Sequence, residues 1–200
     1  MSEVKSSIAV SADGFVTGEG QSPDAPFGHA GERLHEWMFA DPIDPRTAPI
    51  VDEILDGIGA FVMGRRMFGG GDGPWDTSWT GWWGDDPPYH GPVFVLTHHP
   101  RDPLPMDGGT TFNFVNDGIE SALRQAREAA DGRDVSVAGG ADTVNQFLAA
   151  GLLDELHVHI VPFTLGRGER LFDGVGEIHM QPVAVVATPA VTHVRYRFGD

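Results

Sequence analysis

The sequence contains no cysteine, which excludes disulfide bonds and thiolate metal sites. It also lacks an apolar run of the roughly 20 residues that a membrane-spanning helix requires. The amino-terminal stretch holds one lysine and no apolar core, so it is not typical of a signal peptide. We therefore expect a cytoplasmic protein without a membrane partner.

Basic residues are scarce, because 13 Lys and Arg stand against 29 Asp and Glu and give a formal net charge of −16. Nucleic acids and anionic membranes favour lysine and arginine on the surface that binds them, so neither is an expected partner. The negative net charge is still compatible with a phosphorylated small molecule as ligand, if the basic residues are concentrated in one place. The length of 200 residues fits a single domain, residues 1–200, with its own core.

The chain is organised around residues 134–171. A short apolar run ends at Gly139-Gly140, a helical pattern continues from Val144, and an alternating strand follows at 156–161. The order strand, glycine turn, helix, strand predicts two parallel strands. Adjacent glycines at a helix start let an anion approach the backbone N–H groups, so this turn is a candidate phosphate site. The alternative is a tight turn that binds nothing.

The remaining patterns predict further strands and short helices. Apolar strands are expected at 60–63, 93–96 and 111–115, and a β-branched antiparallel pair is expected at 183–187 and 191–198. Helical patterns occur at 32–39, 50–58 and 119–126. Together they predict a three-layer α-β-α domain with a mixed, mostly parallel sheet of about eight strands, antiparallel C-terminal strands and helices on both faces.

Three predicted strand ends carry complementary groups: Gly64-Arg65-Arg66, Thr97-His98 and Gly139-Gly140-Ala141. Ligands of open α/β sheets bind outside the carboxyl ends of the strands, so these turns are expected to meet at one ligand. A dinucleotide with an extra phosphate fits this set of groups. The Gly-x-Gly-x-x-Gly pattern is absent after the first strand, which argues against an ordinary Rossmann domain. The two arginines could instead be surface residues paired with acids.

Several segments occur in an order that resembles the dihydrofolate reductase-like fold: Ser11-Ala12-Asp13-Gly14, Val62 to Phe68, Val95-Leu96-Thr97, Val137-Ala138-Gly139-Gly140 and Leu153 to Leu156. They are most similar to the family of the C-terminal reductase domain of the riboflavin-biosynthesis deaminase/reductase. The resemblance covers nearly the whole chain. The zinc-dependent deaminase part has no counterpart among these segments, so the two-step enzyme is not expected.

The resemblance implies NADPH as cofactor and hydride transfer to a small heterocycle, pterin-like or aminopyrimidine-like. It implies that the adenosine 2′-phosphate side is held by Gly64, Arg65, Arg66, Thr97 and His98. It also implies that the pyrophosphate and nicotinamide ribose are surrounded by Gly139, Gly140, Ala141, Asp142 and Thr143. Asp13 matches the aspartate of the family near the nicotinamide and substrate.

Candidate catalytic residues are Asp13 and Glu36, either of which could supply a proton. Asp13, Trp37 and Trp75 are the expected substrate contacts, although Asp13 could merely cap the turn at Gly14. The tryptophan-rich segment 69–91 is expected to be a lid, an interface patch, or a loop pinned to its own domain by its rings. No acidic residue aligns with the pterin-binding acid of dihydrofolate reductases, so folate reduction is not expected.

No metal site is expected. His157 and His159 share one strand face, but no third ligand is evident, which favours a solvated or interface face over a zinc site. The sequence thus predicts an NADPH-dependent oxidoreductase that acts on a small molecule and forms a homodimer. The alternatives are a non-catalytic nucleotide or small-ligand binding protein of the same fold, and a structural dimer with an empty pocket.

Overall fold

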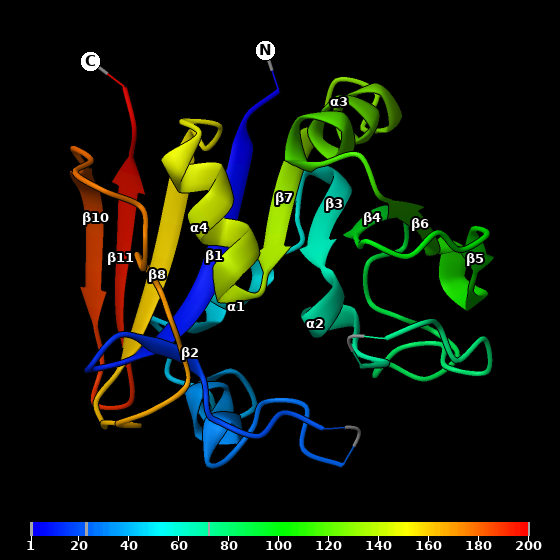
Figure 1. Ribbon diagram of the computed structural model, residues 1–200. Helices are drawn as coiled ribbons and strands as arrows, with labels where there is room; N and C mark the ends of the chain where they lie inside the picture. The colour runs from blue at the N-terminus through cyan, green and yellow to red at the C-terminus, as the bar shows by residue number, and fades with distance from the viewer. Residues whose placement is uncertain (1, 23, 72, 200) are drawn as a thin grey trace.

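A computed structural model describes residues 2–22, 24–71 and 73–199 (Figure 1). Its centre is a nine-stranded sheet. The parallel strands lie side by side in the order β8 (Glu155–Val161), β1 (Val4–Ser11), β7 (Asp134–Gly139), β3 (Ile58–Gly64), β4 (Pro92–Leu96) and β6 (Thr111–Val115). The mixed, mostly parallel sheet expected from the sequence is confirmed, with nine strands instead of about eight.

Antiparallel strands form both edges of the sheet. On one side β11 (Thr192–Arg197) pairs with β8, and β10 (Gln181–Ala187) pairs with β11, as the β-branched C-terminal pattern predicts. On the other side β5 (Leu104–Pro105) pairs with β6. A separate small sheet joins β2 (Phe15–Thr17) to β9 (Glu169–Arg170), two strands that were not expected from the sequence.

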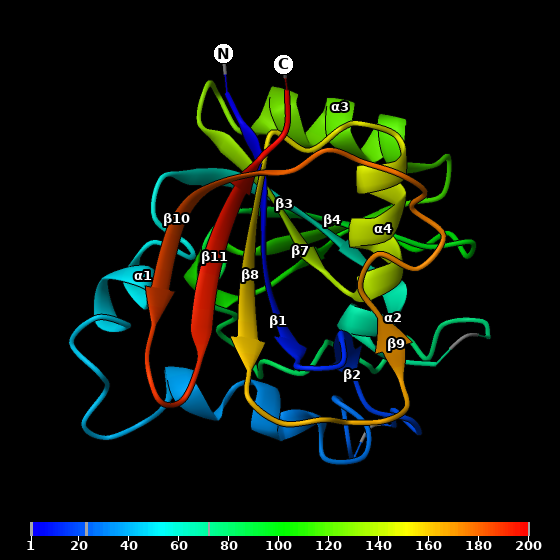
Figure 2. The ribbon, with the colours of Figure 1, turned by 90° about the vertical axis from the view of Figure 1, so that its left-hand side faces the viewer.

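One face of the sheet is covered by the two longest helices, α3 (Ile119–Ala129) and α4 (Ala141–Ala149). Alternate residues of the central strands, among them Val4, Ile8 and Val137, pack against these helices in one large apolar cluster. Because apolar side chains recur on one face of each helix, their burial here stabilises the domain. Figure 2 shows α3 and α4 on one side of the sheet and α1 (Ala48–Asp52) on the other.

The opposite face carries mostly irregular structure. The helical pattern at 32–39 corresponds to two 3-10 helices, η1 (Gly31–Leu34) and η2 (Glu36–Met38), and the pattern at 50–58 to the five-residue α1. The predicted helices are therefore shorter than expected, since Pro42 and Pro49 and the glycines at 57 and 59 limit regular helix here. The segment between α2 (Arg65–Phe68) and β4 is a long loop, residues 69–91. A third 3-10 helix, η3 (Asp107–Gly109), lies between β5 and β6.

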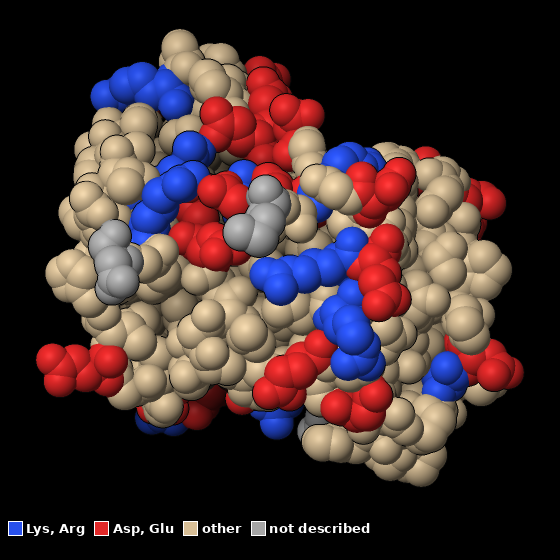
Figure 3. Space-filling model, turned by 90° about the horizontal axis from the view of Figure 1, so that it is seen from above, with Lys and Arg blue, Asp and Glu red and all other residues tan. Residues whose placement is uncertain are grey.

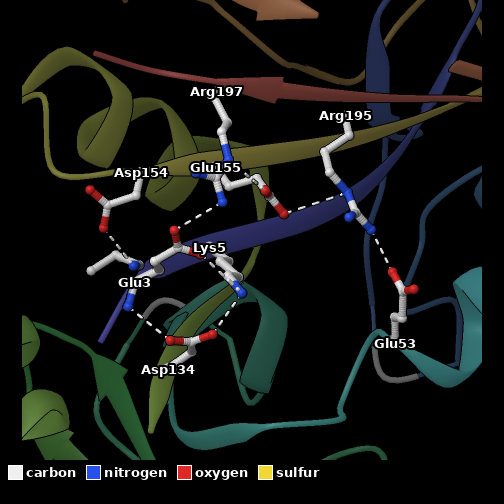
Figure 4. A network of polar contacts seen from close by, with 9 residues as sticks. Glu3, Lys5, Glu53, Asp134, Asp154, Glu155, Arg195 and Arg197 are labelled. Carbon is white, nitrogen blue, oxygen red and sulfur yellow. Dashed lines mark hydrogen bonds and ion pairs between the residues drawn. The ribbon is translucent and has the colours of Figure 1, made fainter. Parts of the chain in front are cut away.

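At the end of the sheet far from the loop 69–91, charged side chains of neighbouring strands contact one another (Figure 4). Lys5 of β1 contacts Asp134 of β7 at 2.6 Å, and Glu155 of β8 accepts contacts from Arg195 and Arg197 of β11 at 3.5 and 3.4 Å. Viewed from this end, basic and acidic side chains are interspersed over the surface (Figure 3). Both chain termini lie at this end of the molecule (Figure 1).

Candidate active site

Two separate apolar clusters cover the irregular face and leave a gap between them. One cluster contains Leu34, Trp37 and Val161, and the other contains Phe61, Phe68 and Phe112. Between the clusters the central strands β1 and β7 present small side chains: Ser7, Ala9, Ser136 and Ala138. Small residues at the centre of a sheet face, with large rings on both sides, leave a hollow.

This hollow is a cavity of about 900 Å³, named here the apolar cavity. Its floor also includes Phe61 of β3 and His159 of β8. One wall comes from the 3-10 helices and the other from the tryptophan-rich loop, through His35, Glu36, Trp37, Met38 and Phe39 and through Trp82, Trp83, Pro88 and Tyr89. Aromatic walls with few polar groups are typical of a pocket for a small planar ligand.

A second cavity of about 740 Å³, the strand-end cavity, lies at the carboxyl ends of β3, β4 and β7. Its lining includes Gly64-Arg65-Arg66, Thr97-His98 and Gly140-Ala141, so the three strand ends singled out in the sequence lie around one space. Asp142 and Thr143 line it as well. All the expected cofactor residues except Gly139 border this cavity, and Gly139 borders the apolar cavity instead.

The amino-terminal end of α4 opens onto the strand-end cavity. Gly140 occupies the N-cap position, and no side chain caps the helix there, so the first N–H groups of α4 remain available to a ligand. Gly64 also lines this cavity, and a Cβ atom at Gly64 would lie 2.4 Å from Oγ1 of Thr143, which explains why only glycine fits. The glycine turn predicted at 139–140 is thus confirmed as a strand-to-helix turn.

Three residues line both cavities: Arg66, Gly140 and Glu169. Arg66 of α2 contacts Glu169 of β9 at 2.5 Å between Nη1 and Oε1. A Cβ atom at Gly140 would lie 3.7 Å from Oε2 of Glu169, with nothing nearer. The two cavities therefore meet at this point, which we name the junction. Ligands in the two cavities would touch one another here.

Arg65 lies beside Arg66 in the sequence, but its guanidinium group holds the loop 69–91. It donates to the carbonyl groups of Gly71 and Gly73 at 2.7 and 2.6 Å, and to Oγ1 of Thr97 at 3.3 Å. The same group lies 3.6 Å from the ring centre of Trp75. Trp75 in turn packs on Phe68 and Phe114 and lines neither cavity, whereas the expected contact Trp37 lines the apolar cavity.

Asp13 also lines neither cavity. Its carboxylate accepts hydrogen bonds from Ser11 Oγ at 2.6 Å and from the N–H groups of Leu165 and Gly166 at 3.0 and 2.8 Å. Burial alone would raise the pKa of Asp13, but these hydrogen bonds lower it below its usual value. In this position Asp13 anchors the loop that follows β8, while the other candidate acid, Glu36, lines the apolar cavity.

A chain of hydrogen bonds runs from the floor of the apolar cavity through the irregular face. Ser7 Oγ lies 2.7 Å from Nε2 of His159, whose Nδ1 lies 2.8 Å from Nδ1 of His193. Nε2 of His193 lies 3.3 Å from Oγ1 of Thr47. Burial lowers the pKa of His159 well below its usual value, so the ring is neutral.

The solvated or interface face expected for His157 and His159 is therefore wrong for His159, which is 2% exposed. The strand β11 covers it with His193, a partner 34 residues further along the chain. Among residues 2–22, 24–71 and 73–199, no group of three or more His, Asp or Glu side chains could hold a metal ion.

Sequence reasoning missed Ser7 and Glu169, whereas it named Glu36 and Trp37, which lie in one wall of the apolar cavity. The alternation in β1 shows that Ser7 lies on one face, but only the strand order reveals that this face is the cavity floor. Glu169 lies in the two-residue strand β9, which has no recognisable motif around it in the sequence. The donor set of the strand-end cavity, which comprises an open helix start, arginines and hydroxyl groups, fits a phosphorylated nucleotide.

Comparison with protein families shows the family to which this chain belongs. A family model described as RibD C-terminal domain matches residues 3–194. The uncharacterized protein YyaP of Bacillus subtilis strain 168 is 25% identical over 177 residues, which is 82% of this chain and 77% of that protein.

Two solved structures have the same fold. A protein from Shewanella sp. PV-4, described as belonging to riboflavin biosynthesis, is 19% identical with a TM-score of 0.68, over 99% of each chain. A dihydrofolate reductase from Enterococcus faecalis, complexed with NADP(H) and RAB-propyl, is 17% identical with a TM-score of 0.59, over 99% of this chain and 97% of that one.

Proposed function

Because the chain belongs to the RibD C-terminal domain family, we propose that it is an NADPH-dependent reductase of a small heterocyclic substrate, pterin-like or aminopyrimidine-like. Its fold is shared with a riboflavin-biosynthesis protein and with a dihydrofolate reductase. The observation that carries the proposal is the junction, where Arg66, Gly140 and Glu169 border both cavities. A nucleotide in the strand-end cavity would reach the apolar cavity only there.

In this proposal, different residues of the strand-end cavity bind different parts of the nucleotide. The uncapped start of α4, at Gly140 to Thr143, receives the pyrophosphate, because N–H groups and the helix dipole favour an anion. Arg66, Thr97 and His98 receive the 2′-phosphate side, which supplies the preference for NADPH over NADH. Arg65 supports this side by fixing the loop and Thr97. Gly139, on the apolar side, leaves space for the nicotinamide ring.

The bound NADPH supplies a hydride, and the residues of the apolar cavity bind the substrate, exclude water and supply a proton. The rings of Trp37, Trp82 and Trp83 sandwich the substrate and exclude water from the apolar cavity. Reduction of a C=N or C=O group also needs a proton. Glu36 lines this cavity and is our proposed source, directly or through water. Asp13 has a lowered pKa and holds a loop, so we assign it to positioning instead.

A titration of the protein with NADPH, followed by nucleotide fluorescence, tests the cofactor assignment. We expect saturable binding of NADPH and weaker binding of NADH, followed by NADPH oxidation when pterins or ribosylaminopyrimidines are added. Failure of both nucleotides to bind would contradict the reductase. Binding without turnover of any substrate class would favour the non-catalytic nucleotide-binding alternative.

The variant Gly140→Ala makes this test specific for the junction. The added methyl group would fill space between the cavities, and the nearest atom at 3.7 Å makes only an ordinary contact. We expect NADPH affinity to fall about tenfold while the protein stays folded. Gly91→Ala is the matched control, because its Cβ atom would also meet its nearest neighbours at 3.6 and 3.7 Å, but away from both cavities.

The expected homodimer and cytoplasmic location belong to the same proposal. No helix in the described part of the chain has the length and apolar character to cross a membrane. For the dimer, the supporting observation is strand β10, which has β11 as its sheet neighbour on one side and exposes Val183 and Val185.

A further inference from the structure

We propose that Ser7 is the hydrogen-bonding contact for the edge of the heterocyclic substrate, and that His159 and His193 behind it determine whether Ser7 donates or accepts. This inference rests on the proposed function, because it assigns a role within the same apolar cavity. It goes further by naming the group that recognises the substrate and the kind of ring edge that fits it.

The position of Ser7 is the first support. It lies on β1 in the centre of the sheet, in the floor of the apolar cavity, where Ile8 and Ala9 are the other β1 residues. His159 is buried behind it, and Trp37 covers the ring of His159 at 4.8 Å between ring centres. Both nitrogen atoms of His159 already have partners. Within this series of hydrogen bonds, the Ser7 hydroxyl is therefore the group with capacity left for a ligand on the sheet floor of the cavity.

The second support is the contact between the two histidines. A neutral imidazole ring carries one N–H group, so the Nδ1 atoms of His159 and His193, 2.8 Å apart, require one donor and one acceptor. Only two arrangements satisfy this contact. Either His159 carries its proton on Nδ1 and His193 on Nε2, or His159 carries it on Nε2 and His193 on Nδ1.

These two arrangements give Ser7 opposite roles. When Nε2 of His159 is bare, the Ser7 hydroxyl donates to it at 2.7 Å and offers only lone pairs to a ligand. When Nε2 of His159 carries the proton, it donates to Ser7, whose O–H is then free to donate to a ligand. At the far end Thr47 accepts from His193 in the first arrangement and donates in the second. The three contacts Ser7–His159, His159–His193 and His193–Thr47 are hydrogen bonds in both arrangements, so neither arrangement breaks the series.

A contact that both donates and accepts fits a ring edge with adjacent N–H and C=O groups. Pteridinediones and pyrimidinediones have such an edge, and the edge changes its own pattern when the ring is reduced or changes tautomer. A fixed donor would lose its hydrogen bond at that point, whereas Ser7 keeps one through the histidine pair. This is the physical advantage of two neutral histidines behind the floor of a mostly apolar cavity.

The test uses lumazine and 1,3-dimethyllumazine as probes, since methylation removes the N–H groups and keeps the ring. Binding to protein saturated with NADP⁺ is measured by quenching of tryptophan fluorescence. We expect wild-type protein to prefer lumazine and Ser7→Ala to reduce that preference about tenfold, the effect of one hydrogen bond that leaves a partner unsatisfied. Ser6→Ala is the control, because Ser6 lies on the other face and donates to the Val137 carbonyl. The Ser6→Ala variant should prefer lumazine over 1,3-dimethyllumazine to the same degree as the wild type.

A preference that persists in Ser7→Ala would overturn the assignment, and so would failure of lumazine to bind the wild-type protein. A second measurement needs no probe. Long-range ¹H–¹⁵N spectra of wild-type protein should show complementary tautomers for His159 and His193, and the same tautomer in both rings would overturn the coupled pair. In Thr47→Val we expect the bare Nε2 atom of His193 to dominate, because an unpaired N–H group at a buried site is costly.

The outcomes separate this inference from the proposed function. If NADP⁺ fails to bind, the reductase is contradicted, and the contrast between the two lumazines is measured without nucleotide and still tests Ser7. If NADPH is oxidised in the presence of a substrate but Ser7→Ala leaves the lumazine contrast unchanged, the recognition role alone is overturned.

Discussion

Arg65 and Arg66 are adjacent in the sequence, but their guanidinium groups contact different parts of the molecule. Arg65 donates to loop carbonyl groups and stacks on Trp75, whereas Arg66 contacts Glu169 at the junction. Consecutive residues at the start of a helix point about 100° apart, which explains the separation. A ligand phosphate would therefore compete with Glu169 for Arg66, while Arg65 stays bound to the loop.

The first prediction concerns Arg66. In Arg66→Ala we expect NADPH affinity to fall about tenfold, because a charge-assisted contact with phosphate is lost at a largely exposed side chain. NADH affinity should change less than threefold. Nucleotide fluorescence titrations of both dinucleotides measure the ratio.

Arg46→Ala is the control for this prediction, because Arg46 also pairs with a carboxylate, Asp44, at 2.8 Å and lines neither cavity. An equal loss of NADPH and NADH affinity in Arg66→Ala would show that Arg66 does not contact the 2′-phosphate.

The tryptophan-rich loop is the first feature at the scale of elements. Arg65 holds it at residues 71 and 73, and Arg101 donates to the carbonyl group of Trp79 at 2.8 Å. The rings of Trp75, Trp79 and Trp83 pack against the apolar cluster of β3, β4 and β6. The loop is therefore pinned to its own domain, and at the same time Trp82 and Trp83 form a wall of the apolar cavity.

The second prediction is that Arg65→Ala loosens this loop. Loss of the two hydrogen bonds to loop carbonyl groups and of the contact with Trp75 should increase the rate of proteolytic cleavage within residues 69–91 at least fivefold, since each contact contributes about 1 kcal/mol. Limited proteolysis with mass spectrometry locates the cut. The variant Arg66→Ala, changed one residue away, should be cleaved at the wild-type rate. Equal cleavage rates in all three proteins would show that Arg65 does not hold the loop.

The third prediction concerns the histidines on β8 and β11. Burial, with a smaller contribution from Arg195, lowers the pKa of His157 to about 4. The unfolded chain takes up a proton near pH 6.5 and the folded chain does not, so stability is lost as pH falls from about 6.5 towards 4. We expect the free energy of unfolding to drop by about 1–2 kcal/mol between pH 7 and pH 5 for His157 alone.

Urea denaturation at both pH values measures this loss. In His157→Gln the difference between pH 7 and pH 5 should shrink by the same amount, and His159 and His193 should supply the remainder. Carboxylates such as Asp13, whose pKa is lowered in the folded state, lose their contribution only below about pH 4 and do not interfere. An unchanged difference in His157→Gln would show that His157 is protonated equally in both states.

Local features could be predicted from the sequence, and distant pairings could not. The glycine turn at 139–140 is encoded by neighbouring residues, so the turn and the helix after it were predicted from the pattern alone. The pairing of His159 with His193 depends on β11 lying beside β8, which no local pattern states. The apolar cavity likewise depends on small residues from β1 and β7, which are neighbours in the sheet and more than a hundred residues apart in sequence.

At the scale of the whole molecule, the edge strand β10 is the surface that a second copy would cover. Its residues are mostly exposed, including Val183 at 46% and Val185 at 63%. An open edge with exposed β-branched residues favours pairing with another strand. The register between β10 and β11 shifts between Pro182 and Ala184, near the start of β10, so the regular part of the strand after this shift is the expected contact.

The fourth prediction follows from this edge. We expect wild-type protein to sediment as a dimer in analytical ultracentrifugation, and Val185→Lys to raise the dimer dissociation constant at least tenfold, because a buried charge without a partner opposes association. Ala129→Lys adds the same charge on an exposed part of α3, far along the sheet from β10, and should stay dimeric. A dimer that persists in Val185→Lys would place the contact elsewhere.

The charged contacts at the end of the sheet opposite the cavities have a consequence for chain connectivity. Arg197, at the end of the last strand, contacts Glu3 at 2.9 Å, so the beginning and the end of the fold are spatial neighbours (Figure 4). A short flexible linker could close the chain into a ring, and the exposed segment around 176–177 could be opened instead. Such a circular permutant would start at β10 and keep every strand neighbour, with the new ends remote from the Ser7 floor.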